Sequence, residues 1–146
     1  IYSNIVLDEQ SIYFSNNKNE FFALNSKNGF VKWKQNLSAI LPPIIINNIV
    51  FTISDNGYLA ILDKKKGNIL RSTNIKKELK IKENRGFIIG KKHIFLTFDP
   101  GQLIKINVNN GKPENIYKIH RGSISRPYVF DGHLYIVTDK SIKKFD

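Results

Sequence analysis

Short apolar runs rich in branched and aromatic residues recur along the whole chain, and turns rich in Asn, Asp and Gly separate them. Residues of this kind favour pleated strands, and the runs lack the spacing of an amphipathic helix. Four inner runs lie at residues 11–14, 49–52, 94–97 and 134–137, and a second run follows each of them at residues 21–24, 59–62, 103–106 and 142–145. The pattern therefore predicts an all-β chain.

The same turn follows the second run in three of these copies. An Asn or Asp stands four residues before a glycine at residues 25–29, 63–67 and 107–111. In such a turn the short polar side chain can bond the local backbone. The three glycines are 38 and 44 residues apart, and a fourth copy ends at Asp146, the turn residue itself. A repeating unit of about forty residues therefore organises the chain.

Each unit contains signals for four strands. A short run opens the units at residues 5–7, 44–46, 87–89 and 128–130, and an outer strand follows the turn glycine, most clearly at residues 30–34 and 68–71. Four short strands in about forty residues are typical of a β-propeller blade, which must stack on its neighbours to bury both faces. A β-sandwich is the alternative, and the regular turn favours the propeller. We predict blades at about residues 4–37, 43–76, 86–119 and 127–146.

These units amount to a β-propeller fragment of about three and a half to four antiparallel four-stranded blades, at or below the usual four to eight. The first residues enter the repeat without a cap or signal segment, so we expect a longer protein whose N-terminal half lies outside this sequence. The last blade then lacks its outer strand and has an open edge. We expect the fragment to self-associate through that open edge.

Residues 23–34, Ala-Leu-Asn-Ser-Lys-Asn-Gly-Phe-Val-Lys-Trp-Lys, resemble the repeat of propellers of the pyrroloquinoline-quinone (PQQ) type. That repeat reads Ala-Leu-Asp, a few variable residues, Gly, and then Trp on the outer strand. The resemblance implies that Trp33 packs between neighbouring blades. The equivalent places hold Arg71 in the second unit and Asn115 in the third.

Within this superfamily, the tail of the chain is similar to the C-terminal end of the BamB family of outer-membrane assembly lipoproteins. The similarity rests on residues 125–128, 131–135 and 143–146, and residues 104–111 fit the same register. It implies a non-enzymatic scaffold at the periplasmic face of the outer membrane, held by a lipid anchor outside this fragment. By the same resemblance, the partner is the barrel subunit of the outer-membrane assembly machinery. No partner-binding residue of that family is recognisable here.

Charge adds a second hypothesis about partners. The 146 residues carry a formal net charge of +11, which suits phosphates, acidic proteins or anionic lipid headgroups. However, 19 lysines stand against 4 arginines, whereas nucleic-acid readers favour the planar, bidentate Arg. Ile, Asn and Lys share A/T-rich codons, so genome composition also explains the charge. We therefore predict no nucleic-acid partner, and a basic nucleic-acid-binding propeller stays an alternative.

No pattern of catalytic chemistry stands out. The absence of cysteine excludes disulfides, thiolate clusters and a Cys nucleophile. The enzyme alternative is a fragment of a PQQ-dependent quinoprotein dehydrogenase, but such enzymes commonly carry a vicinal Cys pair. His93, His120 and His133 lack the spacing of a zinc site, and Ser123 lies near His120 without a nucleophile elbow. We predict no catalytic residue, no cofactor and no metal.

The most unusual stretch is residues 74–85, where an insertion lengthens the connection between units. From Gly67 to the inner strand at Ile94 is 27 residues, against 20 and 23 for the corresponding distances in the other units. A solvated connection is one interpretation, and a basic contact loop for an acidic partner or membrane surface is the other. The candidate contact residues are Lys76, Lys77, Lys80, Lys82 and Arg85.

Overall fold

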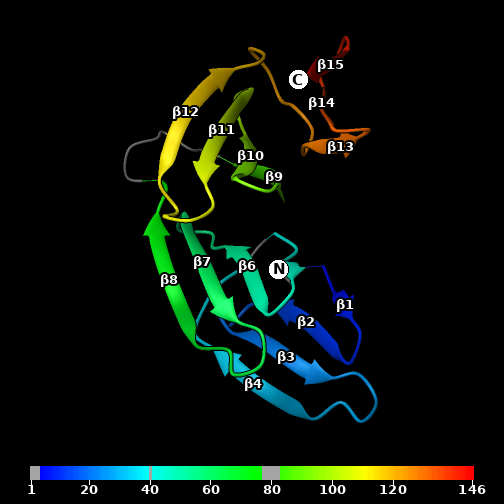
Figure 1. The fold of residues 1–146 in the computed structure, drawn as a ribbon, viewed down its shortest axis with the longest axis vertical. Coiled ribbons are helices and arrows are strands. Elements are labelled where there is room, and N and C mark those ends of the chain that lie inside the picture. The colour runs from blue at the N-terminus through cyan, green and yellow to red at the C-terminus, as the bar shows by residue number, and fades with distance from the viewer. Residues whose placement is uncertain (1–3, 40, 77–82) are drawn as a thin grey trace. The chain divides into compact units, whose positions relative to one another are not determined.

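The computed structural model describes residues 4–39, 41–76 and 83–146. Across these residues the chain forms fifteen β-strands and no helix, which confirms the predicted all-β class (Figure 1). The described residues accordingly include no helix long and apolar enough to span a membrane.

The chain divides into two compact units, Ile1–Lys77 and Glu78–Asp146. Each unit holds two antiparallel sheets in which neighbouring strands follow one another in sequence. The first unit contains β1 (Val6–Asp8), β2 (Ser11–Ser15), β3 (Phe21–Asn25) and β4 (Val31–Gln35), then β5 (Ile44–Ile46), β6 (Ile49–Ile53), β7 (Tyr58–Asp63) and β8 (Ile69–Asn74). The second contains β9 (Asn84–Ile89), β10 (His93–Phe98), β11 (Gln102–Asn107) and β12 (Pro113–Lys118), then β13 (Tyr128–Phe130), β14 (His133–Val137) and β15 (Ile142–Phe145).

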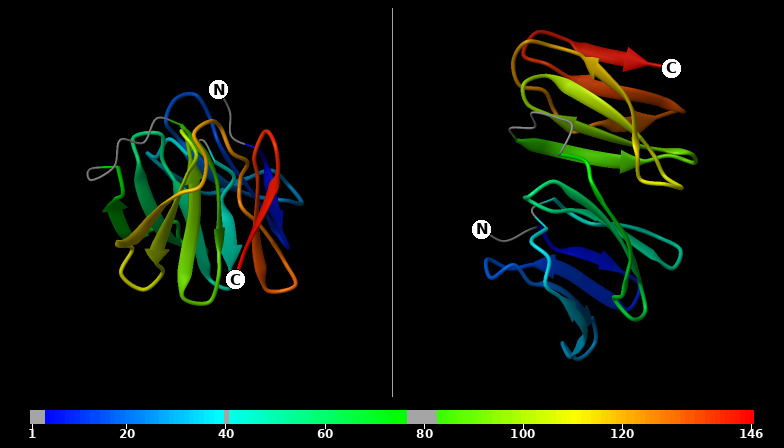
Figure 2. Two further views of the ribbon diagram at one scale, coloured as in Figure 1. Left: turned by 90° about the horizontal axis from the view of Figure 1, so that it is seen from above. Right: turned by 90° about the vertical axis from the view of Figure 1, so that its left-hand side faces the viewer.

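Three sheets have four strands, and the sheet β13-β14-β15 has three. Figure 2 shows that the two sheets within each unit are stacked one on the other. Four meandering antiparallel sheets of this kind make a β-propeller fragment of about four blades, as the repeat predicts.

The Asn/Asp turns have the same geometry in all three copies. Gly29, Gly67 and Gly111 have φ values of 73°, 74° and 69°, in the left-handed region that favours glycine. Each glycine N–H donates to the carbonyl of the Asn or Asp four residues earlier, at 2.8–2.9 Å. The Asn or Asp side chain accepts backbone N–H bonds within the turn, as from Lys27, Lys66 and Asn109. This shared geometry explains why the residue types recur.

Aromatic side chains join the two sheets of the first unit. Trp33 on β4 packs against the rings of Tyr13 and Phe21, with centroid distances of 5.9 and 5.6 Å, and is 7% exposed. Its indole Nε1 donates to the carbonyl of Lys64 in the neighbouring sheet at 2.9 Å. The predicted position of Trp33 between blades is therefore confirmed.

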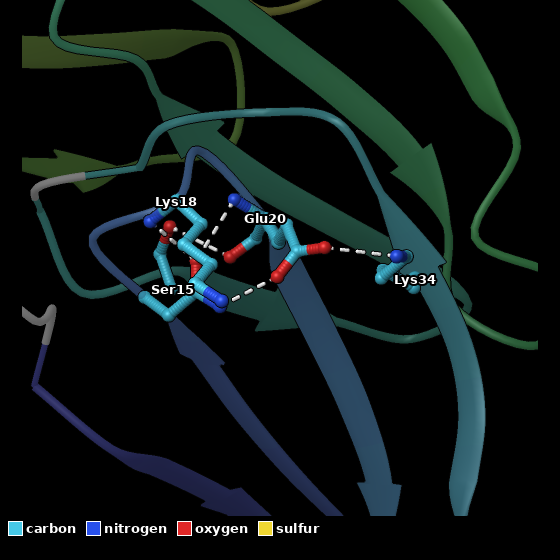
Figure 3. Close-up of polar contacts among 5 residues, drawn as sticks. Ser15, Lys18, Glu20 and Lys34 are labelled. Atoms are coloured by element: carbon cyan, nitrogen blue, oxygen red, sulfur yellow. Dashed lines mark hydrogen bonds and ion pairs between the residues drawn. The ribbon is translucent and has the colours of Figure 1, made fainter.

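The hairpin between β2 and β3 is fixed by a polar cluster (Figure 3). Asn16 Nδ2 and Lys34 Nζ donate to the two carboxylate oxygens of Glu20, at 2.7 and 2.8 Å. Ser15 Oγ donates to the Glu20 carbonyl at 3.1 Å. The hydrogen bond from Lys34 is the main cause that lowers the pKa of the Glu20 carboxyl. The cluster ties β4 to the end of the hairpin.

The second unit has its own core. Leu103, Ile119, Ile124, Leu134 and Ile136 form its buried cluster. Ile88, Phe95 and Phe145 are partly buried beside it. No tryptophan lies in this unit, since Trp33 is the single tryptophan of the chain.

Candidate functional site

Of the five candidate contact residues, the structure describes Lys76 and Arg85. Lys77, Lys80 and Lys82 lie outside the described residues. Lys76 follows β8, where its Nζ donates to the carbonyl of Asp55 at 3.2 Å and its backbone N–H donates to Asn74 Oδ1 at 3.0 Å. Its aliphatic stem covers Gly57 so closely that a side chain at that glycine would collide with it. Lys76 therefore holds the end of β8 against the β6–β7 turn.

Arg85 on β9 is bound by side chains of its own unit. Its Nε donates to Asp99 Oδ2 at 2.9 Å, a second guanidinium nitrogen pairs with the same oxygen, and Ser123 Oγ accepts at 3.2 Å. The hydrogen bond from Arg85, supported by the one from Ser123, lowers the pKa of the Asp99 carboxyl. Arg85 thus links the third sheet to the loop before the fourth, and only a third of its side chain is exposed.

The three histidines each meet a carboxylate of their own unit. His93 Nε2 lies 3.1 Å from Glu114, His120 Nε2 lies 2.8 Å from Asp139, and His133 Nδ1 lies 3.1 Å from Asp146. Ser123, which the sequence places near His120, donates its hydroxyl to Asp99 at 3.1 Å. Within the described ranges no three His, Asp or Glu side chains gather as metal ligands would. The pairs act as local links between strands and loops.

A polar hollow of about 620 Å³ lies in the first unit beside the β1–β2 turn. Lys64 Nζ pairs there with Asp8 Oδ2 at 2.5 Å, and this hydrogen bond raises the pKa of Lys64. Lys32 Nζ donates to the Gln10 carbonyl at 2.9 Å and to Ser11 Oγ at 2.8 Å. Lys64 and Lys32 therefore both bind groups of this chain.

A second cavity, of about 550 Å³, lies between the two sheets of the second unit. Its walls are mainly apolar, with Phe95, Leu103, Leu134 and Phe145 from the facing sheets. Lys105 also reaches it. The hydrophobic pattern of the sequence does not predict this cavity, because it depends on how the two sheets of the unit pack.

Exposed apolar side chains gather on edge strands. On β1, Leu7 is 72% exposed; on β13, Phe130 is 74% exposed; and on β15, Ile142 is 69% exposed. Among the described residues, β15 pairs with β14 alone, in a sheet of three strands. Unpaired strand edges with apolar residues offer backbone and side-chain contacts to another polypeptide.

The fold of this chain agrees with comparisons to known proteins. A sequence model of the family described as outer membrane protein assembly factor BamB matches residues 1–73, half of the chain. The chain belongs to the BamB family. The BamB of Legionella pneumophila (strain Paris) is 24% identical over 112 residues, which cover 75% of this chain and 28% of that protein. The chain thus spans less than a third of the length of this curated relative.

Solved structures show the same fold. The crystal structure of BamB from Moraxella catarrhalis matches with a TM-score of 0.73 and 16% identity, over 99% of this chain and 46% of that one. The computationally designed Ika4 protein matches with a TM-score of 0.74 and 10% identity, over 98% of this chain and 91% of its own. At such low identities the likeness concerns the propeller fold and not a binding site.

Proposed function

We propose that this chain is part of a non-enzymatic scaffold of the BamB type, which binds a protein subunit of the outer-membrane β-barrel assembly machinery. The match of the family model to residues 1–73 carries the proposal. The scaffold works at the periplasmic face of the outer membrane, and a lipid anchor elsewhere in the full-length protein attaches it there. Its propeller positions rim loops and strand edges, and binding involves no covalent chemistry.

The contacts of the described residues support a binding role. Apolar side chains stand exposed on edge strands of both units, as Leu7 and Ile142 illustrate. The three histidines, and Lys32 and Lys64 beside the polar hollow, pair within the chain. An arrangement of this kind supplies surface for a partner more readily than it supplies a reacting group.

The proposal includes the basic contact loop, but with three of its five candidate residues. Lys76 and Arg85 have structural contacts within their own units, so Lys77, Lys80 and Lys82 are the residues proposed to face an acidic partner. Long surface lysines steer an acidic partner toward its site mainly by accelerating association.

The experiment is an affinity measurement between the full-length protein and the purified periplasmic region of the barrel subunit. We expect saturable binding, and we expect added PQQ with calcium to leave the unfolding temperature unchanged. Reversal of Lys77, Lys80 and Lys82 to Glu should weaken binding, whereas the same reversal of Lys66, Lys91 and Lys92, three exposed lysines, should not. A thermal shift with PQQ and no binding to the barrel subunit would replace the scaffold with the quinoprotein alternative.

A further inference from the structure

The turn between β7 and β8 combines exposed cations with exposed aliphatic side chains (Figure 1). Lys65 and Lys66 lie in the turn and are exposed. Ile69 and Leu70, which begin β8, are 46% and 57% exposed, and Arg71 after them is exposed as well. Pairing with β7 skips Leu70, which is the extra residue of a bulge, and a bulge redirects the side chains of its strand. We call these five residues the β7–β8 tip.

Contacts with the first sheet fix the backbone of this turn. Trp33 Nε1 donates to the carbonyl of Lys64 at 2.9 Å, and Gln35 Nε2 donates to the carbonyl of Gly67 at 2.8 Å. Lys64 Nζ also pairs with Asp8. The side chains of the β7–β8 tip take no part in these contacts. A backbone held by the neighbouring sheet therefore presents them.

The fold does not require these residue types. The third sheet has the same turn, with Gly111 at a φ of 69° where this turn has Gly67 at 74°, and it has the same bulge. At the positions of the two lysines and the two aliphatic residues, the third sheet holds Asn109, Asn110, Pro113 and Glu114. The turn therefore forms without lysines and without an exposed aliphatic pair.

The carboxylates nearest the β7–β8 tip already meet cations or donors of the chain. Asp8 and Glu9 lie 2.5 and 4.0 Å from Lys64 Nζ, and Asp63 accepts from the backbone N–H of Lys66 at 2.6 Å. Among the described residues, no carboxylate pairs with the three cations of the tip. At this end of the first unit the described cations, Lys27, Lys32, Lys64, Lys65, Lys66 and Arg71, outnumber the carboxylates Asp8, Glu9 and Asp63. The surface around the tip is therefore positive.

We infer that the β7–β8 tip binds the surface of a membrane that contains anionic phospholipids. Such a surface attracts lysine and arginine, and aliphatic side chains beside them enter the boundary between headgroups and acyl chains. Ile69 and Leu70 line neither of the two hollows described above, and a fluid lipid surface accepts projecting side chains without a matching shape. A single acyl chain holds a protein only weakly, so a basic and apolar patch strengthens attachment. This inference goes beyond the scaffold role, because the contact needs no partner protein.

The test is cosedimentation of the full-length polypeptide, prepared without an acyl chain, with phosphatidylcholine vesicles that contain either no or about 30% phosphatidylglycerol. We expect saturable binding to the anionic vesicles that weakens as salt rises, and binding at least about tenfold weaker to the neutral ones. Lys65→Asn combined with Lys66→Asn should weaken binding to anionic vesicles about tenfold to thirtyfold. Lys91→Asn combined with Lys92→Asn is the control, because it removes the same charge from the β9–β10 turn, and should weaken binding about twofold at most.

A second pair of variants tests the aliphatic contribution. Ile69→Ser combined with Leu70→Ser should weaken binding to anionic vesicles at least about fivefold and leave its salt dependence unchanged. Ile116→Ser combined with Tyr117→Ser is the control, since these side chains are 48% and 43% exposed on β12, the outer strand of the third sheet. This control should bind like the wild type. The unfolding temperatures of all the variants should equal that of the wild type, because the replaced side chains are exposed.

The outcomes separate lipid from protein. Equal binding to neutral and anionic vesicles, or equal losses in the tip variants and their controls, would overturn the inference. Affinity for the barrel subunit is measured with the same variants in the absence of lipid. A loss there, with vesicle binding unchanged, would assign the tip to a protein partner and overturn the lipid contact. Vesicle binding by a protein that does not bind the barrel subunit would overturn the scaffold role alone.

Discussion

At the residue scale, the turn glycines separate two physical effects. Gly29 and Gly67 have nearly the same φ, 73° and 74°, yet only Gly67 lies under an aromatic ring. A Cβ at Gly67 would approach Trp33 Cδ2 to 2.5 Å, whereas a Cβ at Gly29 would meet nothing within 4 Å. A side chain at either glycine would strain the backbone, and at Gly67 it would also collide with Trp33.

Gly67→Ala should therefore destabilise the protein more than Gly29→Ala, by about 1–3 kcal/mol, the usual cost of overpacking. Urea unfolding of both variants measures the difference. In a Trp33→Ala background the difference should shrink, because the ring that the new methyl group meets has gone. Equal costs in the wild-type background would show that Gly67 serves only its turn.

Asp99 provides a prediction about pH. Its folded pKa is lowered, mainly by the hydrogen bond from Arg85, so its contribution to stability is present above the unfolded pKa and disappears as pH falls through the folded pKa. Asp99→Asn should cost about 1–3 kcal/mol at pH 7. The variant should also lose less stability than the wild type between neutral pH and the acid range, as chemical unfolding at several pH values would measure. Parallel pH profiles would contradict the pairing.

Some of these residue contacts can be predicted from the sequence, and others cannot. The turns of Asn25, Asp63 and Asn107 are visible in the sequence because their geometry depends on neighbouring residues. The pair of Arg85 and Asp99 was not predicted, because it depends on the register of two strands and a loop. Without that register, Arg85 appears in the sequence as one more cation of a basic segment.

At the element scale, the repeat predicts strand order but not every strand end. The outer strands begin one residue later than expected, at Val31 and Ile69, because pairing shifts by one residue beside the turn, between Ala23 and Leu24 and between Ile61 and Leu62. The third sheet has the same shift between Lys105 and Ile106. Such bulges bend a strand without leaving a signal in the hydrophobic pattern.

The edge strand β15 leads to a prediction about association. Ile142 is 69% exposed on the last strand of a three-stranded sheet, so another strand can pair beside it. Ile142→Glu should lower self-association of the fragment in sedimentation velocity, because an edge charge opposes strand addition. Phe30→Glu is a control, since Phe30 is 74% exposed in the turn before β4. A wild-type fragment that sediments as a monomer at all concentrations would contradict edge pairing.

At the scale of the whole molecule, the fold and the net charge contribute differently to binding a partner. The propeller repeat sets the positions of edges and loops, while the net charge of +11 sets the field that a partner meets first. Lysine abundance alone does not reveal which cations are available. The structure shows that Lys32, Lys34 and Lys64 bind within the chain. A count of charges in the sequence therefore overstates the surface open to a partner.

If the field assists an acidic partner, the association rate should fall steeply with ionic strength and the dissociation rate should change little. Stopped-flow measurements with the barrel subunit between about 50 and 300 mM salt would separate the two rates. Reversal of Lys77, Lys80 and Lys82 should reduce the salt dependence of association more than reversal of Lys66, Lys91 and Lys92. Both variants change the net charge equally, so a difference between them would depend on where the replaced lysines lie. An equal reduction in both variants would assign the effect to the field of the whole molecule and remove the loop from the proposed contact.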